Sequence, residues 1–369
     1  MAHLQRVSRE ELLRLLILGR CHQLTNLLLH HHFSKHSYAH SVTTAQKLHT
    51  MKKSYYDSQA HKHTQPVRVL YQNLKHWFKN TYPQFQTEEL DKAIKNLGLH
   101  EEINVIDRED KVAMPAGVGT FKIITIQETF LSYLWCISYS LLFIYDKQIH
   151  EPKINPDFEL TDDLTEKLSK AHSLFKYGLS LLKSYNYWDI EDLPNPEYYD
   201  ELDDEYIEKA NGVYVNAVNF ILLHELAHVS LGHIDNDISH EENGTKAEAQ
   251  EILDGEYEAD AFAFERIVKG ASYLTNQSTV AAGVVTGLCS FLFFTTTLKG
   301  GDHPDPDERL KIALDKLNLQ PEDNLWGVSC LAFKLWAMAT GIELNWPPIV
   351  DTYQDLFNLT VQTLNKRKH

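Results

Sequence analysis

Apolar residues recur at three- and four-residue intervals along most of the chain, which is the spacing of helices that bury one face. The first such stretch opens with the capping box Ser8-Arg9-Glu10-Glu11, a sequence typical of a helix N-terminus. The pattern predicts helices over residues 12–28, 67–78, 87–98, 161–185 and 247–269.

A different pattern covers residues 103–125, where Ile103, Val105 and Ile106 are interspersed with polar residues and Gly117 and Gly119 interrupt the chain. Short alternating runs between glycines are typical of strands, so we predict a small β-sheet here. The fold class expected from both patterns is α+β and predominantly helical.

Two long apolar runs, residues 129–145 and 273–298, contain no charged residue. Lys299 follows directly after the second run. A membrane span needs about 20 apolar residues. The first run is shorter, and the second contains polar residues, among them Asn276 and Gln277. We predict two buried core helices and no stable transmembrane insertion, with membrane association left open.

The polar segments are expected to connect these elements. Residues 34–65 are predicted to be a helix or a loose connector, and His30–His32 a polar loop. The acidic residues 189–204 are expected to be a solvated linker, and residues 239–246 a polar loop.

Charge divides the chain unevenly. The formal net charge of −16 disfavours nucleic acid as a general partner. Residues 1–80 nevertheless carry +9, with eleven of the twenty histidines, while the remainder carries −25. This basic, His-rich extension either docks on an acidic surface or is a solvated helical arm. Its charged residues exclude a secretory signal. Four scattered cysteines without a Cys-x-x-Cys pair suit a reducing cytoplasm.

The candidate chemistry begins with His224-Glu225-Leu226-Ala227-His228. Residues four apart share one face of a helix, so His224 and His228 can direct imidazole nitrogens at one ion. Glu225 lies beside them and can accept a proton from an attacking water. The preceding apolar run predicts a buried helix, where three ionisable side chains are costly without a function. The alternative is a solvated helix end with incidental histidines.

Two histidines do not complete a tetrahedral zinc site that keeps one position open, so a third protein ligand is required. Glu256, on the helix predicted over residues 247–269, fits this role, and Glu258 is the competing ligand. Asp260 shares a face with Glu256 and can hydrogen-bond a ligating imidazole. His233 is out of register for a three-histidine site.

Two further candidates follow the second apolar run, in Gly301-Asp302-His303-Pro304 and the helix expected to begin after it. His303 can donate a hydrogen bond to a developing oxyanion. Arg309 can anchor a carboxylate, which belongs either to the chain or to a substrate. A simple helix N-terminus is the alternative for the whole segment.

Together, H-E-x-x-H, E-x-x-A-D and H-P-x-x-x-x-R resemble motifs of the zinc peptidases grouped with HtpX and the CAAX prenyl proteases. The flanking segments Phe130–Cys136, Lys209–Gly212 and Phe220–His228 are closer to the Lit peptidase family of phage-exclusion proteins. That resemblance covers about residues 100–320. It implies a cytoplasmic bacterial zinc peptidase that cleaves a host protein, in the founding case a translation elongation factor, to abort phage infection.

We predict a zincin-like metallopeptidase domain over residues 81–369, with Zn²⁺ held by His224, His228 and Glu256, and the resemblance agrees with Glu256 as the third ligand. Partners are then a protein substrate and an activating phage or partner protein. A peptide could add as a strand to the edge of the 103–125 sheet, although a purely structural sheet is equally open. The alternatives are a membrane-associated CAAX/HtpX-like housekeeping peptidase and a non-catalytic metal-binding protein. Glu225 argues against the second, since such a protein needs no base beside its metal.

Overall fold

The computed structural model of the chain describes residues 51–53, 65–82, 84–107, 110–112, 115–200, 204–244, 247–272, 277–347 and 349–368. The helix predicted over residues 12–28 and the loop predicted at His30–His32 lie outside these residues. Of the segment 34–65, residues Met51–Lys53 form a short strand, β1, instead of a helix or a connector.

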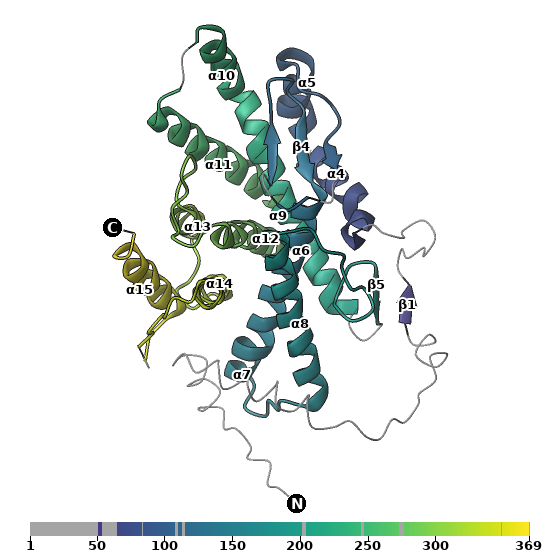
Figure 1. Cartoon of the computed structure of the whole chain (residues 1–369), viewed down its shortest axis with the longest axis vertical. Helices are drawn as coiled ribbons and strands as arrows, with labels where there is room; N and C mark the ends of the chain where they lie inside the picture. The colour runs from purple at the N-terminus through teal and green to yellow at the C-terminus, as the bar shows by residue number, and fades with distance from the viewer. Residues whose placement is uncertain are drawn as a thin grey trace, which may run out of the picture.

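The described part of the chain is mostly helical, as the three- and four-residue spacing predicts (Figure 1). The helices predicted over residues 67–78, 87–98, 161–185 and 247–269 are found close to their expected bounds. In chain order the helical elements are η1 (Pro66–Leu70), α4 (Tyr71–Lys79), η2 (Gln86–Leu90), α5 (Asp91–Leu97), α6 (Glu128–Tyr145), η3 (Asp146–His150), α7 (Glu151–Ile154), α8 (Asp162–Leu181), α9 (Asp204–Ser230), α10 (His233–Glu242), α11 (Ala249–Ser272), α12 (Gln277–Phe291), η5 (Leu292–Phe294), α13 (Pro306–Lys316), α14 (Asn324–Thr340) and α15 (Tyr353–Asn365).

The predicted small sheet is present and has three strands: β2 (Asn104–Ile106), β3 (Ala116–Val118) and β4 (Ile124–Gln127). Their order is β2-β4-β3, with β2 parallel and β3 antiparallel to the central β4. Ile124 and Ile126 point into the core and alternate with half-buried residues, which is the expected pattern for a sheet with one covered face. β3 is an edge strand, and it lies against α9.

The long helix α9 is the centre of the fold, and α4, α6, α11 and α12 all pack against it (Figure 1). The packing extends to residues on the N-terminal side of the boundary expected at residue 80. Val67, Leu70, Leu74 and Phe78 are buried in the same core as α6 and α9. We therefore propose that the helical core of the domain begins at Gln65, and that of the residues before it at least β1 is joined to the domain by strand pairing.

Both apolar runs form buried helices. α6 covers the first run and has all but one of its residues buried. α12 and η5 cover the second, whose first four residues lie outside the described part. Among the described residues, one helix, Gln277–Phe294, is long and apolar enough to cross a membrane, and most of it is buried inside the protein. A core helix passes the same test, so this is weak evidence for insertion.

Close contact between α12 and α9 depends on Gly283. A Cβ atom at this position would lie 2.5 Å from the Asn216 Cβ and 2.9 Å from the Val213 carbonyl oxygen. One turn further along α12, a Cβ on Gly287 would lie 3.5 Å from its nearest neighbour, the Cβ of Ala217. The two glycines thus face the same helix with very different clearance.

Gly283→Ala is expected to lower the free energy of unfolding by about 1–3 kcal/mol, because the added methyl group overpacks the α9–α12 interface. Gly287→Ala is the matched control and should be neutral or stabilising, since it improves helix propensity without a steric clash. Urea unfolding of both variants measures the difference. A stability loss for Gly287→Ala equal to that for Gly283→Ala would contradict the assignment.

The prediction of a solvated linker over residues 189–204 is wrong for residues 195–200, and residues 201–203 lie outside the described part. Asn195 and Glu197 are buried, and Tyr198–Asp200 form β5, which pairs antiparallel with β1. The Asn195 side chain accepts hydrogen bonds from the backbone N–H groups of Glu197 and Tyr198, at 3.1 and 2.8 Å. Glu197, 1% exposed, is neutralised by Arg68, whose Nη2 lies 2.9 and 3.0 Å from its carboxylate oxygens. The acidic composition of this segment therefore led to a prediction of solvent exposure for a turn that is buried.

The loop expected over residues 239–246 also begins later than predicted, because α10 continues to Glu242. His240 on this helix contacts Glu251 of α11, with 3.5 Å between Nε2 and Oε2. α10 is held by this contact and by Ile234 and Ile238, which lie one turn apart and pack on the core.

The buried carboxyl group of Glu128 lies at the first turn of α6. Tyr71 donates a hydrogen bond of 2.8 Å to its Oε1 atom. Burial, followed by a hydrogen bond shared with Asp107, raises the pKa of Glu128 to about 7. In an unfolded chain the pKa of a glutamate is about 4.3. The folded state therefore binds this proton more tightly than the unfolded state.

Stability contributed by this proton is fully present below about pH 4.3 and is lost as the pH rises through about 7. Glu128→Gln should remove up to about 3 kcal/mol of the fall in unfolding free energy between pH 5 and pH 8. Urea denaturation at each pH checks this, with the exposed Glu159→Gln as the control. An unchanged pH profile in Glu128→Gln would show that another group causes the fall.

Candidate metal centre

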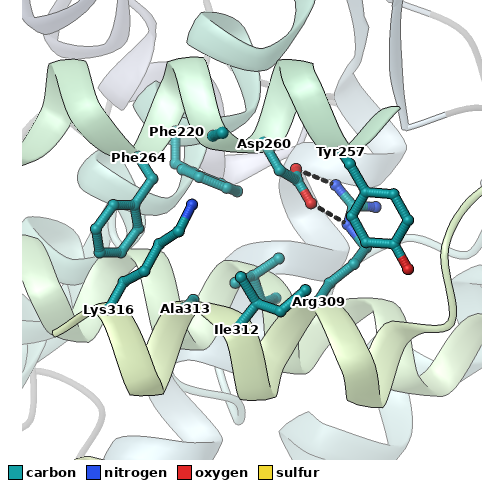
Figure 2. Close-up of a pocket in the computed structure, with 10 residues that line it drawn as sticks. Phe220, Tyr257, Asp260, Phe264, Arg309, Ile312, Ala313 and Lys316 are labelled. Carbon is teal, nitrogen blue, oxygen red and sulfur yellow. Dashed lines mark hydrogen bonds and ion pairs between the residues drawn. The ribbon is translucent and has the colours of Figure 1, made fainter. Parts of the chain in front are cut away.

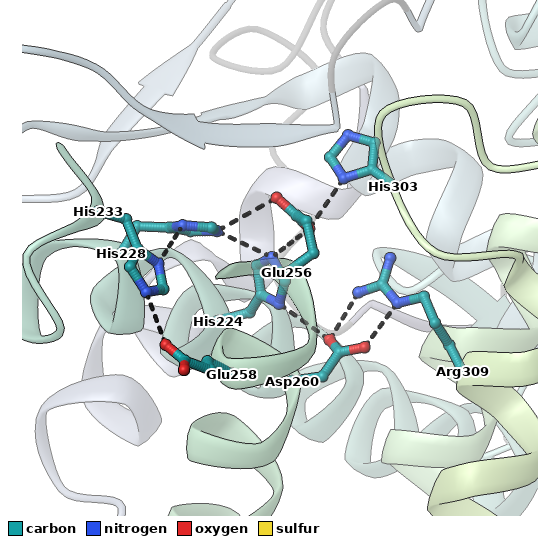
Figure 3. A network of polar contacts seen from close by, with 8 residues as sticks. All are labelled: His224, His228, His233, Glu256, Glu258, Asp260, His303 and Arg309. Carbon is teal, nitrogen blue, oxygen red and sulfur yellow. Dashed lines mark hydrogen bonds and ion pairs between the residues drawn. The ribbon is translucent and has the colours of Figure 1, made fainter. Parts of the chain in front are cut away.

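The last turns of α9 and the middle of α11 bring three potential ligands together (Figure 3). The Nε2 atoms of His224 and His228 are 3.2 Å apart. Glu256 Oε2 lies 3.2 Å from His224 Nε2, and Glu256 Oε1 lies 3.5 Å from His228 Nε2. His224, His228 and Glu256 thus form a buried to half-buried group whose ligand atoms all lie within 4.8 Å of one another.

The contact that His224 makes through Nδ1, its outer nitrogen, shows which ring nitrogen faces the other two potential ligands. His224 Nδ1 lies 2.9 Å from Asp260 Oδ1, and a carboxylate can only accept a hydrogen bond. Nδ1 therefore carries a proton, and Nε2, which faces His228 and Glu256, is the nitrogen that offers a lone pair to a cation once its own proton has left. An imidazole in this tautomer is ready to bind a cation.

The carboxylate of Glu256 also fits a metal ligand. Its Oε2 atom is buried and makes no hydrogen bond of acceptable geometry, although His224 Nε2 and His303 Nδ1 lie 3.2 and 2.8 Å away. A buried acceptor without a hydrogen bond is costly unless something else satisfies it. A divalent cation between the two imidazoles and this carboxylate would do so, and the residues present fit such an ion.

The charges of the two imidazoles are coupled. Burial disfavours a charged His224, but its contacts with Asp260 and Glu256 outweigh this effect and raise its pKa to about 9. Burial, together with the neighbouring charge of His224, lowers the pKa of His228 to about 4. The contacts with His224 and His303 overcome burial and hold the pKa of Glu256 well below its usual range. Without a cation, these pKa shifts favour a positive charge on His224 and a neutral His228.

Asp260 is held in place by Arg309 of α13. Arg309 Nε and Nη2 each donate to a different oxygen of Asp260, both at 2.7 Å. The two side chains form one wall of a cavity of about 30 Å³ between α11 and α13, which Figure 2 shows. The sequence left open whether Arg309 anchors a structural or a substrate carboxylate. In the structure its partner is Asp260, and Arg309 is only 9% exposed. We therefore propose that Arg309 has a structural role and does not bind substrate.

Glu225 follows His224 on α9 and is half-buried. Burial raises the pKa of its carboxyl group, and the charge of His224 partly opposes this. A carboxylate with a raised pKa is a better proton acceptor.

His303 reaches the group from the loop before α13. Its Nδ1 atom lies 2.8 Å from Glu256 Oε2, and its side chain is 61% exposed, so it stands at the open side of the site. The loop is tightly folded at Gly300, where a Cβ atom would lie 2.1 Å from the His303 carbonyl oxygen. The Gly300 N–H donates a hydrogen bond of 2.9 Å to Asp305.

Sequence reasoning did not find Lys368, which supports this loop from the C-terminal end of the chain. Its Nζ atom lies 2.8 Å from Asp305 and 2.6 Å from the buried Asp307. A lone lysine 61 residues after its partner has no recognisable spacing, so no sequence signal could have indicated this contact.

The structure therefore brings together all the side chains that the three motifs singled out, which are His224, Glu225, His228, Glu256, Asp260, His303 and Arg309. Glu258, the competing ligand, points away from this group and contacts His233 instead (Figure 3). His233 in turn contacts the outer nitrogen of His228, with 3.0 Å between the two Nδ1 atoms. It takes no place among the three ligands.

Two imidazoles and a carboxylate beside a second, partly buried carboxylate form an arrangement that metal-dependent hydrolases use. A family model described as Peptidase U49 matches residues 124–329, which is more than half of the chain. The chain belongs to this peptidase family, the family of the Lit-type peptidases. The matched segment runs from β4 to α14 and includes the whole site. No curated protein and no solved structure gives a significant match.

Proposed function

We propose that this peptidase is a zinc-dependent endopeptidase, with zinc held by His224, His228 and Glu256. Two imidazole nitrogens and one carboxylate form a ligand set that suits zinc and leaves a fourth position open. When bound, zinc acts as a Lewis acid that makes water more acidic and a peptide carbonyl more electrophilic. The observation that carries the proposal is the convergence of the Nε2 atoms of His224 and His228 on the carboxylate of Glu256, whose buried Oε2 atom has no hydrogen bond.

The protein's own groups then move the protons. Glu225 accepts a proton from the attacking water as the water oxygen forms a bond with the peptide carbonyl carbon. The protonated Glu225 passes this proton to the amine nitrogen as the peptide C–N bond breaks. His303, exposed at the open side of the site, donates a hydrogen bond to the carbonyl oxygen as negative charge develops there. Asp260 and Arg309 keep His224 in the required tautomer.

We further propose that the substrate lies in an extended conformation along β3. β3 is an edge of the sheet and has one row of backbone groups available for an added strand. It also lies against α9, the helix that carries His224 and Glu225. An edge strand packed on the metal-binding helix is the relation expected of a zincin-like core, which we propose for this domain.

The proposed substrate is a cytosolic protein of the bacterial host, with a translation factor as the first candidate. The proposed context is abortive infection triggered by a phage component or partner protein. Support for these assignments is membership of the Lit-type family. The basic extension before Gln65 is the part of the chain that we propose responds to the trigger.

The test is expression of the full chain beside the Glu225→Gln variant, followed by identification of newly formed protein N-termini in the cells. Cleavage of a small set of proteins by the wild type alone is expected, with slower growth. Equal sets of new N-termini in both cultures would overturn the proposal, because a peptidase centred on another site would be unaffected by this change.

A further inference from the structure

The second histidine of the group, His228, has an outer nitrogen whose partner belongs to none of the three motifs. Its Nδ1 atom lies 3.0 Å from the Nδ1 atom of His233, and the two rings meet edge to face with centroids 5.1 Å apart. His233 Nε2 in turn lies 3.2 Å from Glu258 Oε2. Figure 3 shows the three side chains in a row leading away from the ligand group.

Local backbone geometry explains why His233 can reach back to His228. α9 ends at Ser230, and Gly232 adopts a left-handed conformation, with φ of 84°. This turn ends α9 and redirects the chain, so that His233 at the start of α10 lies beside the last turn of α9. Its ring also lies against α11 at Gly255. The position is thus set by packing on two helices.

Hydrogen-bond chemistry fixes the protons along this row. Glu258, which is 65% exposed, can only accept a hydrogen bond as a carboxylate, so His233 Nε2 carries a proton and donates it. A neutral His233 then has a lone pair on Nδ1, which accepts from His228. His228 Nδ1 therefore carries a proton, and its Nε2 lone pair faces His224 and Glu256. The donor-to-acceptor direction that Glu258 imposes is thus passed through the rings of His233 and His228 to the Nε2 atom of His228, the potential metal ligand.

The other imidazole is fixed differently. His224 donates directly to Asp260, a carboxylate that Arg309 binds with two hydrogen bonds. Within the described residues, the contact of His228 Nδ1 is with His233 and not with a carboxylate, so His228 is linked to one only through His233. Each of the two imidazoles therefore has its own outer carboxylate, the half-buried Asp260 in direct contact with His224 and the exposed Glu258 linked to His228 through His233.

We propose that His233 and Glu258 are positioning residues, which hold His228 in the tautomer and ring orientation that bind the metal. This inference rests on the proposed zinc site. It gives a role to His233, which is out of register for a metal ligand, and to Glu258, the alternative to Glu256 as third ligand in the sequence-based prediction. Outer partners of this kind typically change metal affinity about 10–100-fold when they are removed.

The experiment measures zinc affinity of the metal-stripped full chain by competition with a chromophoric chelator. His233→Phe keeps a ring on α11 but cannot accept a hydrogen bond, and should bind zinc about 10–100-fold more weakly. His233→Gln offers an amide oxygen as acceptor and should recover part of this loss. His240→Phe is the matched control, because His240 also joins α10 to a carboxylate of α11 but has its contact at Glu251. It should bind zinc as the wild type does.

A second measurement does not require the metal. Nitrogen-15 NMR of the histidine rings in the metal-free protein should show His228 protonated at Nδ1 in the wild type and in His240→Phe. In His233→Phe this preference should be lost. If His233→Phe does not fold, Glu258→Ala at an exposed position replaces it, and a weaker form of both effects is expected.

The outcomes separate the two proposals. Equal zinc affinity and an unchanged His228 tautomer in His233→Phe and Glu258→Ala would overturn the positioning role while the zinc site stands. A wild-type chain that binds no zinc would overturn the proposed function, and the tautomer measurement would still decide whether His233 orients His228.

Discussion

Replacing Glu225 with glutamine is expected to lower the rate of peptide-bond hydrolysis by about 10²–10⁴-fold, the usual contribution of a positioned general base. Glutamine has nearly the same shape as glutamate but cannot accept the proton of the attacking water. Because the fold and the ligands His224, His228 and Glu256 are unchanged, zinc content and thermal stability should match those of the wild type.

The measurement is kcat on a protein substrate identified from the cleavage products in cells, with zinc content determined on the same samples. Glu205→Gln is the matched control, since it makes the same change at an exposed position of the same helix, α9. It should cleave at the wild-type rate. Wild-type activity in Glu225→Gln would place the catalytic base elsewhere, and a loss of zinc in that variant would show that the effect is structural.

The second large effect is expected at Glu256. The purified wild type should hold about one zinc ion per molecule, and Glu256→Ala should lose it, because two imidazoles alone do not complete the site. Glu258→Ala should still bind one zinc ion per molecule when one equivalent of zinc is supplied, although with reduced affinity. The structure supports this difference, since Glu256 contacts both His224 and His228 whereas Glu258 contacts only His233 among the histidines of the site.

Elemental analysis after gel filtration gives the zinc-to-protein ratio of each variant. The pair forms its own control, because both changes remove one carboxylate from the same turn of α11. Retention of zinc by Glu256→Ala together with its loss from Glu258→Ala would reverse the ligand assignment. Retention by both would mean that the ion is held elsewhere.

Much of this protein could be predicted from local spacing in its sequence. The three- and four-residue pattern predicted α8, α11 and the helix at residues 67–78, and alternation predicted the small sheet. The spacing within His224–His228 and between Glu256 and Asp260 placed these pairs on single helix faces. Such inferences succeed because the helical repeat is a property of the backbone itself, whatever surrounds it.

Composition was a poorer guide where buried charges are paired. The acidic stretch around Glu197 looked solvated, but Arg68 lies 129 residues earlier and neutralises it. Burial of a charge depends on its partner, and a partner distant in sequence leaves no periodic signal.

Only the tertiary structure decided how the helices dock, and therefore which side chains meet. It brought Asp260 to His224 and Arg309 to Asp260, set His233 against His228, and linked Lys368 to the loop of His303. Helix docking is determined by shape, as at Gly283, where one missing methyl group allows α12 to approach α9. The sequence thus specified the chemistry that each helix can offer, and the packing of helices determined which of these groups act together, because contact across elements depends on side-chain volume and not on spacing along the chain.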